Sequence, residues 1–268
     1  MCPVCEGRLA RGVQSFACTA GHSFDIAQEG YVNLVLAQHR RSAAAGDPKD
    51  SLRHRRAFLD AGHYAPLAAV LVDVLAREAP DRVLDAGCGE GYYLRQLAAA
   101  PLLDGVSLYG VDVAKEAIRL AARAAPQIEF SVGNTYRLPV LDASVAALLQ
   151  VFAPSAPEQL RRVLRTGGLF IEVKPGPCHL EAFRAMIYAQ PQAHTEAEAP
   201  AGFEALDVER VTFPLILQQP EDVAALVEMT PYKWHMNPDT YDRVRELTGL
   251  EDTADFAIGL FRSDRGTP

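Results

Sequence analysis

The chain has 268 residues, of which 49% are apolar and 22% charged, and its net charge at pH 7 is −8. These values are ordinary for a globular protein, and the length fits one large domain with a small appendage. The negative charge excludes a protein that coats nucleic acid indiscriminately, and the absence of a membrane-length apolar run or signal pattern leads us to expect a cytoplasmic protein with no membrane partner.

Two pairs of potential metal ligands stand near the N-terminus. Cys2-Pro3-Val4-Cys5 is followed, after twelve residues, by Cys18-Thr19-Ala20-Gly21-His22. The spacing predicts a tetrahedral zinc site with the ligands Cys2, Cys5, Cys18 and His22. A redox pair would need a preceding strand, and disulfides are disfavoured in a cytoplasmic chain. Four protein ligands leave no open position, so we expect one structural Zn²⁺ that folds a module over residues 1–36.

Residues 37–60 form a polar stretch that we interpret as a basic linker. Six basic residues and two acids lie between positions 39 and 56. A solvated surface is the usual meaning of such a run, but its place between two modules favours contact with nucleic acid. The predicted RNA-binding residues are Arg40, Arg41, Arg53, Arg55 and Arg56.

Residues 61–268 are predicted to form an α/β domain, because helical and strand patterns alternate along them. The predicted helices cover residues 64–79, 92–100, 115–124, 157–165, 221–229 and 239–248. The predicted strands cover residues 82–85, 106–111, 128–132, 145–150, 169–173, 205–217 and 253–261. Such alternation is typical of a mainly parallel sheet with helices on both faces.

A glycine loop follows the first of these strands. In Asp85-Ala86-Gly87-Cys88-Gly89-Glu90-Gly91, the glycines let the backbone approach a ligand that a Cβ would exclude. The dinucleotide fingerprint would need a glycine at Tyr92, so S-adenosylmethionine, which has no phosphate, fits better than a dinucleotide. An ordinary tight turn is the alternative for the glycines.

Asp112 ends the next predicted strand, 27 residues after Asp85. A carboxylate at this point can accept both hydroxyls of a ribose, in S-adenosylmethionine as in NAD. The alternative is a helix N-cap.

The order of several motifs resembles that of one family. The zinc-ligand pairs are followed by Gly62-His63-Tyr64, Gly87-Cys88-Gly89-Glu90-Gly91-Tyr92-Tyr93, Val151-Phe152-Ala153-Pro154, Pro175-Gly176-Pro177 with His179, and Met229-Thr230-Pro231. In this combination the chain resembles the bacterial 23S rRNA (guanine-N1)-methyltransferases, from Cys2 to the C-terminus. The resemblance implies a Rossmann-like class I methyltransferase fold with a seven-stranded, mainly parallel sheet behind an N-terminal zinc module that recognises RNA.

The resemblance also implies S-adenosylmethionine-dependent methylation of a guanine in a hairpin of 23S rRNA. The family has one branch that acts at guanine-745 and a tylosin-resistance branch that acts at guanine-748. Glu90-Gly91-Tyr92-Tyr93 looks like the guanine-745 branch, so guanine-748 methylation, with macrolide resistance, is the alternative. A homodimer is expected on the family resemblance alone.

The expected cofactor pocket combines residues from the loop with residues from the family motifs. By resemblance Tyr64, Gly89, Glu90, Asp112 and His179 line it, although a tyrosine at this helix start is as often a core residue and a lone histidine is more often structural. Many class I enzymes carry an acid after the third strand that holds the adenine amine; this chain has Gly133-Asn134 there, so the adenine would be held by Asn134, by the backbone or in another way. The predicted cofactor-binding set is therefore Tyr64, Asp85, Gly87, Gly89, Glu90, Gly91, Asp112, Asn134 and His179.

Methylation at guanine N1 places two demands on the site. The N1 proton must leave, so a base is needed, with Glu90, Glu172 and His179 as candidates. A splayed-out guanine needs aromatic faces, for which Phe152 and Trp234 are candidates, with core packing as the alternative for Phe152. Two other classes of protein stay open: a small-molecule methyltransferase, and a non-catalytic zinc-containing RNA-binding protein.

Overall fold

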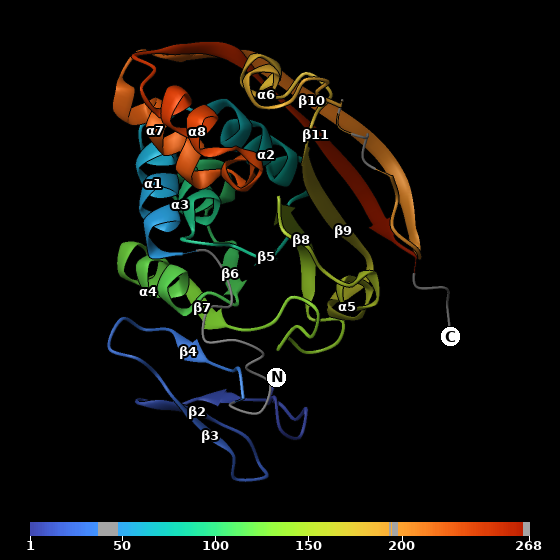
Figure 1. The fold of residues 1–268 in the computed structure, drawn as a ribbon. Coiled ribbons are helices and arrows are strands. Elements are labelled where there is room, and N and C mark those ends of the chain that lie inside the picture. The colour runs from blue at the N-terminus through green and yellow to red at the C-terminus, as the bar shows by residue number, and fades with distance from the viewer. Residues whose placement is uncertain (37–47, 193, 195–197, 265–268) are drawn as a thin grey trace.

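The computed structural model describes residues 1–36, 48–192, 194 and 198–264, and its main feature is one twisted sheet (Figure 1). The strand order is β10-β11-β9-β8-β5-β6-β7-β4. The six strands from β9 to β4 in this order are parallel to one another, and β11 is antiparallel to both β9 and β10. The bounds are β4 (Val32–Asn33), β5 (Arg82–Ala86), β6 (Ser107–Asp112), β7 (Glu129–Val132), β8 (Val145–Val151), β9 (Leu164–Pro175), β10 (Phe203–Leu217) and β11 (Leu250–Ser263).

The predicted mainly parallel α/β class is confirmed, with eight strands instead of seven in this sheet. The extra strand is β4, which comes from the predicted zinc module. Val32 and Asn33 pair in parallel with Ser131 and Val132 of β7, and Val32 is buried. Strand β9 is also longer than predicted, because it runs through the turn at Gly167.

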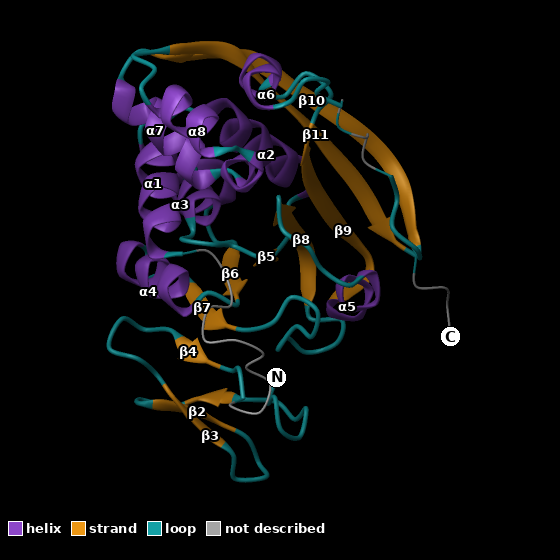
Figure 2. Cartoon of the chain, viewed as in Figure 1, coloured by secondary structure: helices purple, strands orange, loops and turns teal. Residues whose placement is uncertain are grey.

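Helices cover the two faces of the sheet unequally (Figure 2). Residues of α1 to α4, α6, α7 and α8 share a core with one face, whereas on the other face α5 packs against a smaller cluster. The bounds are α1 (Lys49–Asp60), α2 (Ala65–Glu78), α3 (Tyr92–Ala99), α4 (Lys115–Ala124), α5 (Pro157–Val163), α6 (Glu181–Ile187), α7 (Pro220–Met229) and α8 (Pro238–Arg245), with 3-10 turns η2 (Pro101–Leu103) and η3 (Pro231–His235).

Helix α4 illustrates the amphipathic pattern that places these helices on the sheet. Its buried residues Ala117, Ile118, Ala121 and Ala122 recur at helical spacing, so one stripe faces the sheet and the charged residues face water. Among the later helices, α8 starts where the side chain of Asn237 accepts a hydrogen bond from the backbone N–H of Thr240.

The second half of the predicted basic linker is a helix. Residues 49–60 form α1, whose Leu52, Phe58 and Leu59 are buried and which packs against α7. The linker prediction fails here because apolar side chains at both ends of the segment, Leu52 and the pair Phe58 and Leu59, are buried against the main domain. Residues 37–47, which include Arg40 and Arg41, lie outside the described residues.

Within the described residues, no single helix is both long and apolar enough to cross a membrane. Among the described helices, one pair, α1 and α2, meets the test by length and composition when taken together, and the two are bent by 76° relative to each other.

Candidate functional site

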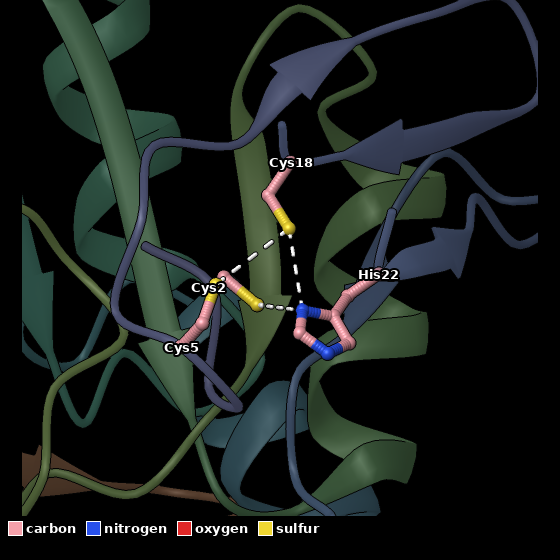
Figure 3. A group of neighbouring side chains, drawn as sticks. All are labelled: Cys2, Cys5, Cys18 and His22. Atoms are coloured by element: carbon pink, nitrogen blue, oxygen red, sulfur yellow. Dashed lines mark hydrogen bonds between the residues drawn. The ribbon is translucent and has the colours of Figure 1, made fainter. Parts of the chain in front are cut away.

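The four predicted zinc ligands converge on one point (Figure 3). Cys18 Sγ lies 3.3 Å from His22 Nδ1, Cys2 Sγ lies 3.7 Å from the same nitrogen, and the sulfurs of Cys5 and Cys18 are 3.7 Å apart. A tetrahedral ion at roughly 2.3 Å from sulfur and 2.1 Å from nitrogen places its ligands about 3.5 to 3.8 Å apart, so the donor set fits Zn²⁺. The ligands come from the turns before β1 (Ala10–Arg11) and after β2 (Ser15–Ala17), which pairs with β3 (Ser23–Asp25).

The zinc module is joined to the main domain along one edge. Besides β4, the amino group of Met1 donates to the carbonyl of Pro139 at 2.8 Å, and Glu6 pairs with Arg137 at 3.1 Å. Exposed ion pairs contribute little, so the strand pairing and the burial of residues such as Tyr31 hold the module. The module is therefore docked on the sheet edge beside β7 and not a free appendage.

A cavity of about 720 Å³ lies at the carboxyl ends of the parallel strands. This is the edge at which open α/β sheets bind ligands. Of the nine predicted cofactor residues, all except Gly91 line the cavity, namely Tyr64, Asp85, Gly87, Gly89, Glu90, Asp112, Asn134 and His179.

The three glycines of the loop have different roles. Gly87 has a φ of +92°, and a Cβ there would come within 2.3 Å of the Ala153 side chain. A Cβ on Gly89 would face open space, with the nearest atom 3.9 Å away on Arg55, so this backbone is open to the cavity. Gly91 was expected to bind cofactor, but it caps α3 and packs against Ala121 and Phe130. It serves the contact between helix and sheet.

Asp112, at the end of β6, holds the glycine loop that follows β5. Its Oδ2 accepts a hydrogen bond from the Gly89 N–H at 2.9 Å, and its Oδ1 accepts one from the Ala114 N–H at 2.7 Å. The second contact lies in the turn before α4, whose N-cap residue is Ala114, so Asp112 is not the helix N-cap of the alternative interpretation. A carboxylate offers about four lone-pair sites, so these contacts are compatible with accepting ribose hydroxyls as well.

Asp85 is buried beneath the glycine loop. Burial, followed by the nearby charge of Asp112, raises its pKa from 3.8 to about 8. Its Oδ1 is buried without a hydrogen-bond partner in the described structure. An unpaired buried acceptor is costly, so this oxygen is suited to accept a hydrogen bond from a ligand.

We expect the raised pKa of Asp85 to make stability fall with pH. The folded chain keeps this proton where the unfolded chain has lost it, so the stabilisation is complete below about pH 4 and is lost as the pH rises towards 8. Between pH 6.5 and 8 the wild type should lose about 1 to 2 kcal/mol more unfolding free energy than Asp85→Asn. Urea unfolding of both proteins at the two pH values measures this difference, and parallel pH curves would contradict it.

The three candidate bases are placed differently. Glu90 is buried in the cavity wall, with Oε2 paired to Arg95 at 2.6 Å and Oε1 without a hydrogen-bond partner in the described structure. Burial lowers the pKa of His179 to about 3, and its Nδ1 accepts the Asp255 backbone N–H at 3.3 Å. The neutral ring therefore carries its proton on Nε2 and is a donor.

Glu172 is not brought to the cavity. Its neighbours Ile171 and Val173 belong to the larger core, so the alternation of β9 directs Glu172 to the other face of the sheet, where it pairs with Lys174 at 2.8 Å. The sequence alone does not show on which face of the sheet a single acid in a strand lies, so Glu172 was a candidate base by residue type and position only.

Aromatic rings line the cavity wall, and they include Phe152 of the predicted pair but not Trp234. Phe152 lines the cavity, has a φ of +54° and is 47% exposed, and its ring lies 5.7 Å from that of the buried Phe256, so it is only partly packed against the core. Trp234 is 72% exposed on η3, where Lys233 lies over its ring, and it does not line the cavity within the described structure. Tyr136, which sequence reasoning missed, lines the cavity and is 56% exposed.

The arginines of α1 also separate into two groups. Arg53 and Arg56 lie at the surface and pair with Asp50 and Asp60 on the same helix. Arg55 instead lines the cavity, and its predicted contact with RNA stays a prediction. A helix places neighbouring residues on different faces, so a count of basic residues does not show which of them face the surface and which face the cavity.

Comparisons with known proteins match both parts of the chain. Residues 1–43 match a zinc-ribbon family model described as "RlmA, N-terminal", and residues 83–168 match a methyltransferase domain. The second match indicates S-adenosylmethionine as the cofactor of this protein, and the first agrees with one structural zinc.

Similar proteins extend over nearly the whole chain. A 23S rRNA (guanine(748)-N(1))-methyltransferase from Streptomyces fradiae is 36% identical over 94% of this chain and 91% of its own length. A relative from Micromonospora griseorubida is 37% identical over 88% of this chain and 87% of its own. Among solved structures, the YcgJ protein of Bacillus subtilis has a TM-score of 0.49 at 15% identity, over 74% of this chain and 98% of that one.

Proposed function

Because the chain belongs to the family of the 23S rRNA (guanine-N1)-methyltransferases, we propose that it transfers a methyl group from S-adenosylmethionine to N1 of a guanine in a 23S rRNA hairpin. The observation that carries this proposal is one cavity that joins the Gly89–Asp112 contact to partly exposed aromatic rings. A cofactor wall beside an open aromatic wall suits a flat base that must reach the methyl donor.

The cofactor supplies an electrophilic methyl group, and the protein positions the acceptor nitrogen in line with it. Phe152 and Tyr136 are suited to hold the base, since their loops are tied by the Thr135 hydroxyl, which donates to the Pro154 carbonyl at 2.8 Å. Ring stacking of this kind is sequence-tolerant, so the zinc module and the outer arginines Arg53 and Arg56 would add the contacts to the hairpin.

Guanine N1 becomes a nucleophile only when its proton has left. Of the three candidate bases, Glu90 is favoured because its Oε1 is buried at the cavity wall without a hydrogen-bond partner in the described structure. The neutral His179 is a hydrogen-bond donor towards the cavity, and Glu172 faces away from it. In this proposal Glu90 takes the N1 proton while Arg95 holds the carboxylate in place.

Two positions of the guanine are candidates. Glu90-Gly91-Tyr92-Tyr93 favours guanine-745, and the name of the Streptomyces fradiae relative favours guanine-748. A homodimer, expected from the family, is tested separately by sedimentation.

Primer extension on 23S rRNA tests the function and the position together. N1-methylguanine cannot form a Watson-Crick pair, so reverse transcriptase stops beside it. We expect one stop that disappears when the gene is deleted and returns when zinc-loaded protein and S-adenosylmethionine are added to the unmodified rRNA. An unchanged stop pattern with methylated extracted metabolites would favour a small-molecule methyltransferase, and RNA binding without methyl transfer would favour a non-catalytic protein.

A further inference from the structure

The charge of the cofactor cavity is unbalanced. Three acids line it, Asp85, Glu90 and Asp112, whereas Arg55 is the one lysine or arginine among its lining residues in the described part of the chain. Asp85 keeps its proton at neutral pH, because its pKa is about 8, and Glu90 is paired with Arg95 at 2.6 Å. An anionic group of a ligand that enters this cavity would therefore be attracted to one place, the guanidinium of Arg55.

Arg55 lies beside the glycine loop. It extends from α1, its Nη2 donates to the carbonyl of Met229 at 3.3 Å, and its Nη1 is 3.9 Å from where a Cβ on Gly89 would stand. The guanidinium therefore lies between the glycine loop and the C-terminal end of α7. Since α1 packs against α7 and buries Phe58 and Leu59, the helix that carries Arg55 is fixed in the core.

The methionine end of S-adenosylmethionine carries an ammonium and a carboxylate. The buried Oδ1 of Asp85, which has no hydrogen-bond partner in the described structure, is suited to the ammonium. The carboxylate needs a cation or donors in the same cavity, and a guanidinium can bind it through two parallel hydrogen bonds. We propose that Arg55 binds the α-carboxylate of the cofactor, with His179 as a neutral donor beside it.

This inference assigns Arg55 to cofactor binding and not to RNA, and it rests on the cavity holding S-adenosylmethionine. It does not depend on which RNA is methylated. A binding experiment without RNA therefore separates its failure from a failure of the proposed substrate.

The test compares two ligands by calorimetry on the zinc-loaded full chain. S-adenosylhomocysteine has the amino-acid end, and 5′-methylthioadenosine lacks it. For Arg55→Gln we expect the dissociation constant of S-adenosylhomocysteine to rise by at least about 30-fold, as for a lost charge-assisted pair, with that of methylthioadenosine changed less than about threefold. Lys49→Gln, an exposed change on the same helix, should leave both constants unchanged.

Arg55→Lys guards against a folding defect, since it keeps the charge but not the two-pronged geometry. We expect it to bind S-adenosylhomocysteine more weakly than wild type and more tightly than Arg55→Gln. Equal weakening of both ligands in Arg55→Gln would overturn the proposal in favour of a structural role. Unchanged binding of both ligands would overturn it as well.

Discussion

Asp112→Ala is expected to raise the dissociation constant for S-adenosylhomocysteine at least about tenfold. The change removes both acceptors that hold the backbone N–H groups of Gly89 and Ala114, at 2.9 and 2.7 Å. It also removes the carboxylate placed to accept the ribose hydroxyls. Hydrogen bonds to a charged group contribute roughly 1.5 to 3 kcal/mol each, so the loss of even one predicts about a tenfold effect or more.

Calorimetry measures this effect, and Asp73→Ala provides the control. Asp73 is an exposed acid on α2, so its removal changes the net charge equally without touching the cavity. Methylthioadenosine should lose affinity for Asp112→Ala as well, because it retains the ribose. Wild-type affinity in Asp112→Ala would remove this residue from the cofactor site and leave only its contacts with the backbone of Gly89 and Ala114.

Cys2→Ser is expected to lose the bound zinc and to lower rRNA methylation by at least about 100-fold. Cys2 is fully buried, and the strands of its module are two or three residues long. So small a unit cannot bury enough apolar surface to fold without its metal. Loss of the module also removes β4 from the sheet edge and releases the contacts that Met1 and Glu6 make with the loop after β7.

Metal analysis of the purified protein should show one zinc per wild-type chain and less in Cys2→Ser. The matched control is Cys178→Ser, an exposed cysteine outside the cluster, which should keep its zinc. We expect Cys2→Ser to bind S-adenosylhomocysteine within about fivefold of wild type, since the described residues that line the cavity all follow residue 54. Full methylation by a zinc-free protein would contradict the structural role of the metal.

The local chemistry of this protein was readable from its sequence. The zinc ligands were predictable because metal geometry fixes their spacing, and one ligand atom from each of the four residues does lie within 4.8 Å of the others. The parallel sheet was predictable because hydrophobic periodicity and turn residues act over short distances. The glycine loop and Asp112 could be paired because consecutive parallel strands place their carboxyl ends at one edge.

Only the tertiary structure decided which side chains meet across distant segments. It directed Glu172 to the far face of β9, assigned Gly91 to helix packing, left Trp234 at the surface and turned Arg55 into the cavity. It also inserted β4 of the zinc module as an eighth strand. The direction of one side chain depends on strand register and helix rotation, and these are fixed by packing between segments far apart in the chain.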